Sequence, residues 1–172
     1  MIGPVTLRAA VAAAMALCAG EAAAQQAPAQ GQAEGRAAPA WLATCTNTGE
    51  GGALECEIAQ SIVVQATGAR VMTATLRTSP PAAPVLALTL PHGMFLPAGV
   101  RIAVDGEGGP AEAVRTCDAN GCHLGRELEP AALERLLGGR ELSVTFQDLQ
   151  RRDISLTLGL EGLADAYRRA VP

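Results

Sequence analysis

The chain has 172 residues, of which 49% are hydrophobic and 2% aromatic, and its 17 acidic residues outnumber its 13 basic residues to give a formal net charge of −4. Once a leader is removed, this length allows one domain with an apolar core, but not two. The acidic balance argues against nucleic acid or an anionic membrane as the main partner, because no basic stripe is available to neutralise phosphates.

Residues 1–24 have the pattern of an export signal. Arg8 precedes an apolar run at residues 9–17, and Ala22-Ala23-Ala24 forms a small-residue cleavage site. The run is shorter than the roughly 20 residues needed to cross a bilayer, and no later stretch is long enough without charge. We therefore expect a signal peptide cleaved after Ala24 and no integral membrane segment in the mature chain. The expected location is periplasmic or secreted, with outer-membrane association left open.

Residues 25–40 are rich in Gln, Ala, Gly and Pro and contain no aromatic or β-branched residue. Such a segment buries too little apolar surface to fold, so we expect a disordered tether. The folded part is then expected to be a single domain at residues 41–172.

The segments that follow the tether are short and strand-like. Residues 41–46 alternate, with Trp41, Ala43 and Cys45 on one face, and we expect Trp41 to be a buried core residue rather than a ligand-stacking platform. The turn residues Asp105-Gly106 separate two of the later segments. Further strands are expected at residues 54–65, 71–78, 85–90, 100–104, 113–117, 122–128, 142–146 and 153–158.

Two short helices are expected late in the chain. Residues 130–139 begin with Pro130, carry leucines at helical spacing and end in two glycines, and residues 162–170 place apolar residues on one side. Many short strands with two minor helices indicate an all-β fold. We expect a β-sandwich or flattened barrel of antiparallel strands, stapled by disulfides.

Four cysteines, Cys45, Cys56, Cys117 and Cys122, remain in the mature chain after Cys18 leaves with the leader. An even set in an oxidising compartment favours two disulfides over a zinc or redox-active site, and neither C-x-x-C nor paired His ligands occur. Four cysteines allow three connectivities, which the sequence leaves open. The preferred pairing is Cys45 with Cys56 and Cys117 with Cys122, so that each bond joins the two strands of one hairpin. For the second pair, Asn-Gly before Cys122 tolerates positive φ in a tight turn.

Motifs for catalysis are missing from the sequence. There is no lysine, G-x-S-x-G, P-loop, G-x-G-x-x-G or H-E-x-x-H, and His92 and His123 are the only imidazoles. The spacing supplies neither histidine with a nucleophile and an orienting carboxylate. We therefore expect no catalytic residue, no metal site and no cofactor.

Residues 90–106, LPHGMFLPAGVRIAVDG, resemble the pattern L-P-L-G-V-x-L-x-x-G-V-x-L-x-V-D-G, and residues 160–166, LEGLADA, resemble a closing G-F-x-x-A. With the Cys117–Cys122 hairpin between them, they resemble the invasion-associated locus B family of bacterial secreted proteins over most of residues 41–170. The resemblance implies a periplasmic or envelope-exposed β-sandwich in a family named for a member that promotes entry of a pathogen into host red cells. It carries over no catalytic residues. His92 stands where the family tends to have an aliphatic residue, and Leu163 where it often has Phe.

Two hypotheses follow. The first is an exported, non-catalytic envelope protein that binds an unidentified envelope or host protein and contributes to host-cell invasion or envelope integrity. Its candidate interaction loop comprises Pro91, His92, Gly93, Asp105 and Gly106. The alternative is a small secreted enzyme or enzyme inhibitor with an unrecognised site around His92, His123, Asp105 and nearby arginine. The oligomeric state is left open.

Overall fold

The computed structural model describes residues 36–37, 41–47 and 54–171. The predicted signal peptide and all but two residues of the predicted tether lie outside the described residues. Those two, Arg36 and Ala37, form strand β1 instead of a disordered segment, because they pair with Val63 and Ile62 at the end of β3. Strand β3 runs past the last pair that it makes with β2, so its main chain is free to pair there.

Seven of the described strands form one antiparallel sheet. Its order is β1-β3-β4-β5-β9-β8, and β2 pairs with β3 beside β1. The bounds of the strands other than β1 are Leu42–Asn47 (β2), Leu54–Val63 (β3), Arg70–Thr78 (β4), Val85–Leu90 (β5), Thr116–Asp118 (β8) and Gly121–Glu127 (β9).

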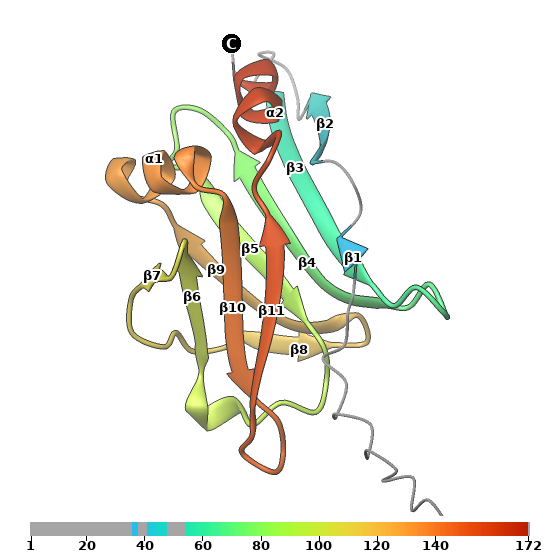
Figure 1. The fold of residues 1–172 in the computed structure, drawn as a ribbon. Helices are drawn as coiled ribbons and strands as arrows, with labels where there is room; N and C mark the ends of the chain where they lie inside the picture. Colours follow the sequence, from blue (N-terminus) through green and yellow to red (C-terminus); the bar gives the residue numbers. More distant parts are fainter. Residues whose placement is uncertain (1–35, 38–40, 48–53, 172) are drawn as a thin grey trace, which may run out of the picture. The chain divides into compact units, whose positions relative to one another are not determined.

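A four-stranded antiparallel sheet, in the order β11-β10-β6-β7, forms the second layer (Figure 1). Its strands are Val100–Val104 (β6), Glu107–Gly108 (β7), Glu141–Gln147 (β10) and Asp153–Gly159 (β11). In the described residues neither sheet closes on itself, so the fold is a β-sandwich, as expected from the sequence, and not a barrel.

Three short helices complete the described elements. A 3₁₀ helix, η1 (Leu96–Ala98), precedes β6 and was not expected from the sequence. Helix α1 (Pro130–Gly138) has Pro at its first turn, where the missing N–H costs nothing. Helix α2 (Leu163–Ala170) follows Gly162, whose φ of +82° favours glycine.

The core lies between the two sheets and under the helices. Strands β5 and β10 alternate between buried and partly buried side chains, as a strand with one face on a core should. Trp41 is 5% exposed and belongs to this core. Leucine, isoleucine, valine, methionine and alanine supply most of the rest, including Ile58, Met72, Leu76, Leu88, Leu90, Val100, Leu136, Leu142, Val144, Leu158 and Leu163.

Candidate functional site

The hairpin of β8 and β9 carries the second disulfide. Cys117 lies directly opposite Cys122, with 3.9 Å between their Cα atoms, and the two are bonded. The turn itself is Ala119-Asn120, and the Asp118 Oδ1 accepts the Asn120 N–H at 2.7 Å. Of the Asn-Gly pair only Gly121 has a positive φ, +144°. A Cβ at Gly121 would lie 2.4 Å from the Leu90 carbonyl oxygen, so this position requires glycine.

The first disulfide joins Cys45 of β2 to Cys56 of β3, with 4.1 Å between the Cα atoms. Cys56 is 1% exposed, and its Sγ lies 3.2 Å from the Ala170 carbonyl oxygen at the end of α2. Cys45 is exposed. The structure thus pairs the four cysteines as preferred from the sequence, and both bonds join neighbouring strands of a hairpin.

The segment Pro91-His92-Gly93 follows β5 and contacts the tip of the β8–β9 hairpin. The His92 Nε2–H donates to the carbonyl oxygen of Asp118 at 2.7 Å. His92 and Gly93 are exposed, and Gly93 has a φ of +83°. The disulfide holds the hairpin and the histidine holds the loop to it. These residues therefore form one connected surface, which we call the clipped tip: residues 91–93 and 116–123. His92, Gly93 and residues 116–120 are exposed, whereas Gly121 and Cys122 are buried beneath them.

His123 contacts the same aspartate from the other side. Its Nε2 lies 3.0 Å from the Asp118 Oδ1, and its Nδ1 lies 3.3 Å from the Thr89 Oγ1. The contact with the His123 imidazole, and next the N–H of Asn120, lower the pKa of Asp118 from its ordinary value of 3.8. Asp118 therefore links both histidines, through its carbonyl to His92 and through its carboxylate to His123.

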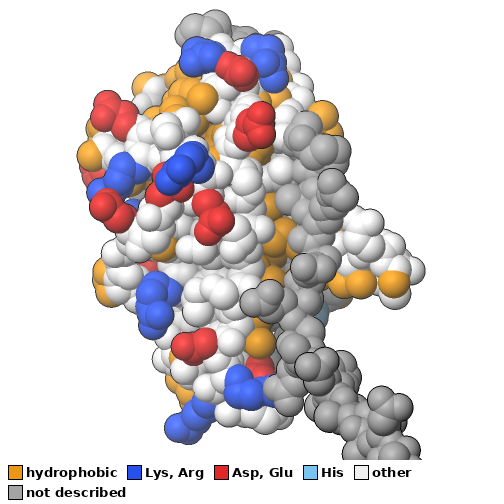
Figure 2. Space-filling view, in the orientation of Figure 1, with side chains coloured by type: hydrophobic (Ala, Val, Ile, Leu, Met, Phe, Trp, Pro, Cys, Tyr) orange, Lys and Arg blue, Asp and Glu red, His pale blue; other side chains and the backbone are white. Residues whose placement is uncertain are grey.

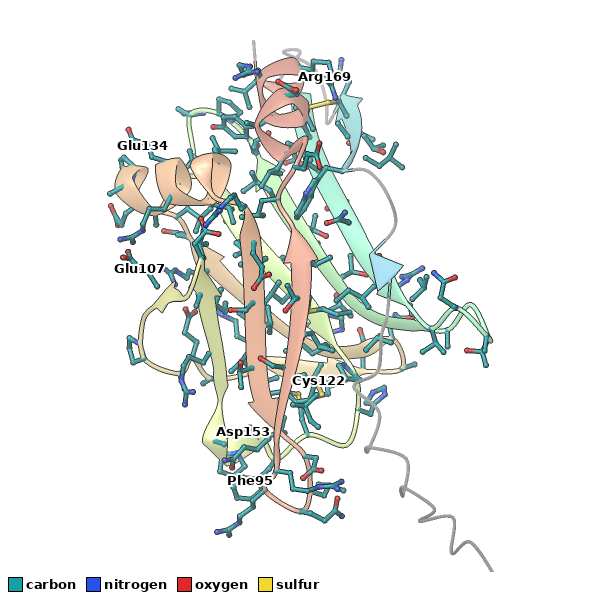
Figure 3. All side chains as sticks on the ribbon, in the orientation of Figure 1. Phe95, Glu107, Cys122, Glu134, Asp153 and Arg169 are labelled. Carbon is teal, nitrogen blue, oxygen red and sulfur yellow. A yellow bond between two sulfur atoms is a disulfide. The ribbon has the colours of Figure 1, made fainter. Side chains whose placement is uncertain are left out.

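Sequence reasoning did not find this role of Asp118. The signal lies in the register: Thr116 pairs with His123, which makes Asp118 and His123 diagonal neighbours on one face of the hairpin. The Cys117–Cys122 pairing and the two-residue turn together set that register. Figure 3 shows the Cys117–Cys122 bond at this end of the seven-stranded sheet, beside the label of Cys122.

Asp105-Gly106 forms the turn expected after residues 100–104, and it joins β6 to β7, a short strand that was not expected from the sequence. Both residues have positive φ, +49° and +82°, as a type I′ hairpin turn requires. The Asp105 carboxylate accepts the N–H groups of Arg140 and Glu141 at 3.2 and 3.0 Å, which ties the turn to the start of β10.

The residues proposed as one interaction loop therefore lie at two places. Pro91-His92-Gly93 precedes η1 and β6, whereas Asp105-Gly106 follows β6 at its other end (Figure 1). Met94 bridges to Asp148 just beyond the end of β10, while Asp105 contacts the start of β10, a separation of about 20 Å along that strand. The structure brings His92 and His123 together around Asp118, and it leaves Asp105 apart from both.

Two further searches concern metals and membranes. Among the described residues, no group of three or more His, Cys, Asp or Glu side chains is placed to hold a metal ion. In the same part of the chain, no helix is long and apolar enough to cross a membrane.

Comparison with known proteins identifies a family and solved structures of similar fold. The model of the family described as Invasion associated locus B (IalB) protein matches residues 41–171. The crystal structure of invasion associated protein b from Bartonella henselae aligns with a TM-score of 0.67 and 21% sequence identity, over 76% of this chain and 90% of that chain. At this identity the alignment shows a shared fold. Among curated proteins, none matches the chain.

Proposed function

Because the chain belongs to the invasion-associated locus B family, we propose that it is an exported, non-catalytic envelope protein that acts by binding another protein. The bound protein belongs to the envelope or to a host cell, and binding contributes to envelope integrity or to host-cell invasion. The two disulfides support export, because such bonds form and persist outside the cytoplasm. The leader pattern at residues 1–24 supports the same location.

The observation that carries the proposal is the clipped tip. His92, Gly93 and residues 116–120 are exposed, yet a disulfide and the bond from His92 to Asp118 hold them in one arrangement. A rigid surface loses little conformational entropy on binding, and this is how protein-binding loops gain affinity. The net negative charge is consistent with recognition of a protein rather than of nucleic acid.

The test is crosslinking of the tagged chain in living cells of its own organism, followed by mass spectrometry of what it captures. The matched variant is Cys117→Ser/Cys122→Ser, which frees the hairpin but keeps the other disulfide. We expect a defined envelope or host protein that is captured by the natural chain and lost in the variant. Circular dichroism of the purified variant checks that the sandwich still folds. Equal recovery of abundant neighbours by both chains would refute the proposal.

A second candidate, a small secreted enzyme or enzyme inhibitor, is favoured by one observation. His123 contacts the Thr89 hydroxyl and the Asp118 carboxylate, the order of groups used in nucleophilic catalysis. Binding remains the preferred function because Thr89 is partly buried in β5 and Asp105 lies elsewhere. Hydrolysis of p-nitrophenyl acetate by the natural chain, lost in His123→Gln, would reverse this preference.

A further inference from the structure

A cavity of about 260 Å³ lies between helix α1 and the strands β6 and β7, at the end of β6 away from the clipped tip. Its floor is the core itself. The side chains that form the floor are 0–5% exposed and apolar: Leu86, Ile102, Leu128, Leu136 and Leu142. A group that enters this cavity therefore meets apolar side chains and leaves water behind.

The wall of the cavity is fixed by a close approach of α1 to β6. Gly139 directly follows α1, and a Cβ at that position would lie 2.4 Å from the Val104 Cγ1. Gly108 of β7 is equally tight, because a Cβ there would lie 2.6 Å from the Ile102 carbonyl oxygen. Two glycines thus let helix and hairpin close on the sheet, and the cavity is a preformed feature of the fold.

Charges of both signs surround the opening. The Arg126 guanidinium donates to Glu112 at 3.0 Å, whereas no described residue pairs with the side chains of Glu107 or Arg135. Figure 2 shows arginine and acidic side chains side by side around α1, and Figure 3 shows Glu107 below that helix, which also carries Glu134. An unpaired acid and an unpaired base at one rim match the N–H donors and C=O acceptors of a peptide main chain.

We propose that this cavity receives one large apolar side chain of an extended segment of the protein partner, with Glu107 and Arg135 contacting the main chain of that segment. The inference rests on the proposed function and names how the partner is recognised. The volume lies just below the roughly 300–1,000 Å³ of pockets that hold drug-sized ligands, so it suits a single side chain. Apolar anchors that fill such pockets carry most of the affinity of protein interfaces.

The first experiment titrates ¹⁵N-labelled protein with capped amino acids and follows amide shifts by NMR. N-acetyl-leucinamide should shift the amides of Gly108, Gly109 and Arg135 to saturation. N-acetyl-alaninamide should bind about tenfold more weakly or worse, because it buries fewer methylene groups. Octanoate tests whether a free amphiphilic acid is the occupant instead. Absence of saturable shifts with N-acetyl-leucinamide, or tighter binding of octanoate, would overturn the proposal.

The cavity-filling variant is Ala132→Leu, since Ala132 lines the cavity from α1 and is partly buried. Its matched control is Ala131→Leu, the same change at an exposed neighbour outside this cavity. We expect Ala132→Leu to lose binding of N-acetyl-leucinamide and Ala131→Leu to keep it. If Ala132→Leu does not fold, Ala132→Met offers a more flexible side chain at the same site. Equal binding by the filled variant and the control would overturn the proposal.

The same variants separate this inference from the proposed function. In the crosslinking experiment, a partner that is captured equally by Ala132→Leu and Ala131→Leu leaves the proposed function standing and refutes the role of the cavity. Capture of no defined partner by the natural chain refutes the proposed function, whatever the capped amino acids do. Analytical ultracentrifugation tests whether a second copy of the chain fills the cavity. Self-association of the natural chain that is lost in Ala132→Leu but kept in Ala131→Leu would identify a second copy as the occupant and would overturn the proposal. Exposed Leu42 or Leu149 would then be the side chain that enters the cavity.

Discussion

The indole nitrogen of Trp41 donates a hydrogen bond to the carbonyl oxygen of Gly159 at 3.0 Å, across 118 residues of sequence. Trp41 directly precedes β2 in the seven-stranded sheet, and Gly159 ends β11 in the four-stranded sheet. The tryptophan therefore connects the two layers at their edge, while its ring packs in the core at 5% exposure.

Replacing Trp41 with Phe should lower the free energy of unfolding by about 1–2 kcal/mol, from one lost hydrogen bond and a smaller apolar side chain. Chemical denaturation followed by circular dichroism measures this, because Trp41 is the only tryptophan and its fluorescence disappears in the variant. Tyr167→Phe is the control: it also removes a polar group from a partly buried aromatic residue, but no described residue bonds that hydroxyl. A loss in Tyr167→Phe as large as in Trp41→Phe would contradict the prediction.

The two disulfides should contribute unequally to stability. Loop-closure entropy predicts that removing Cys45–Cys56, with a separation of 11 residues, costs about 3 kcal/mol, and that removing Cys117–Cys122, with a separation of 5, costs about 2 kcal/mol. Each bond has one buried partner, Cys56 at 1% and Cys122 at 3% exposed, so burial adds to both costs and the length of the closed loop sets the order. Thermal unfolding of the two double-alanine variants tests the order, and a reversed order would show that native-state strain outweighs chain entropy.

Gly121 should be irreplaceable, whereas Gly125 in the same strand should not. Gly121→Ala forces a Cβ to within 2.4 Å of the Leu90 carbonyl oxygen at a φ of +144°, and we expect a loss of about 2–4 kcal/mol. Gly125→Ala meets only the Val85 Cγ1 at 3.7 Å and should be neutral or stabilising by less than about 1 kcal/mol. Urea denaturation of both variants measures the difference. Similar stabilities would mean that the hairpin relaxes around the new side chain.

Local patterns in the sequence predicted much of this fold. Alternation located β4, an apolar run ending at Pro91 located β5, and Asp105-Gly106 marked a hairpin turn because both residue types tolerate positive φ. The preferred cysteine pairing rested on two other expected hairpins, which the structure forms from β2 with β3 and from β8 with β9. These features depend on residues close in sequence, where period and turn chemistry are informative.

Relations that depend on strand register or on packing between elements were not predictable in the same way. The Asp118–His123 contact depends on the hairpin register, and the cavity under α1 depends on how Leu136 packs over β6 and β10. Strand β1 forms because β3 extends beyond its last pair with β2. The composition of residues 25–40 does not indicate such a pairing. Even the family-like run at residues 90–106 gave no sign that its two ends serve different parts of the surface.

The clipped tip should depend on pH through Asp118. Folding lowers the pKa of this carboxyl, so the folded state favours the ionised form. Ionised Asp118 therefore stabilises the fold above pH 3.8, the ordinary pKa. This stabilisation is lost as the pH falls through the lowered pKa of the folded state. We therefore expect Asp118→Asn to melt at a lower temperature than the natural chain at pH values well above 3.8, and the gap to close as acid protonates Asp118 in the folded state. A gap that stays constant with pH would show that charge is not the cause.

The contribution of His123 to this effect can be isolated by NMR titration of the Asp118 carboxyl carbon. In His123→Gln, the pKa of Asp118 should rise back toward 3.8, because the largest cause of its lowering is gone. It should stay somewhat below 3.8, since the Asn120 N–H still donates to the Asp118 Oδ1 at 2.7 Å. His92→Gln serves as the control, because His92 contacts the Asp118 carbonyl and not its carboxylate. An equal rise in both variants would assign the effect to the position of the hairpin rather than to His123.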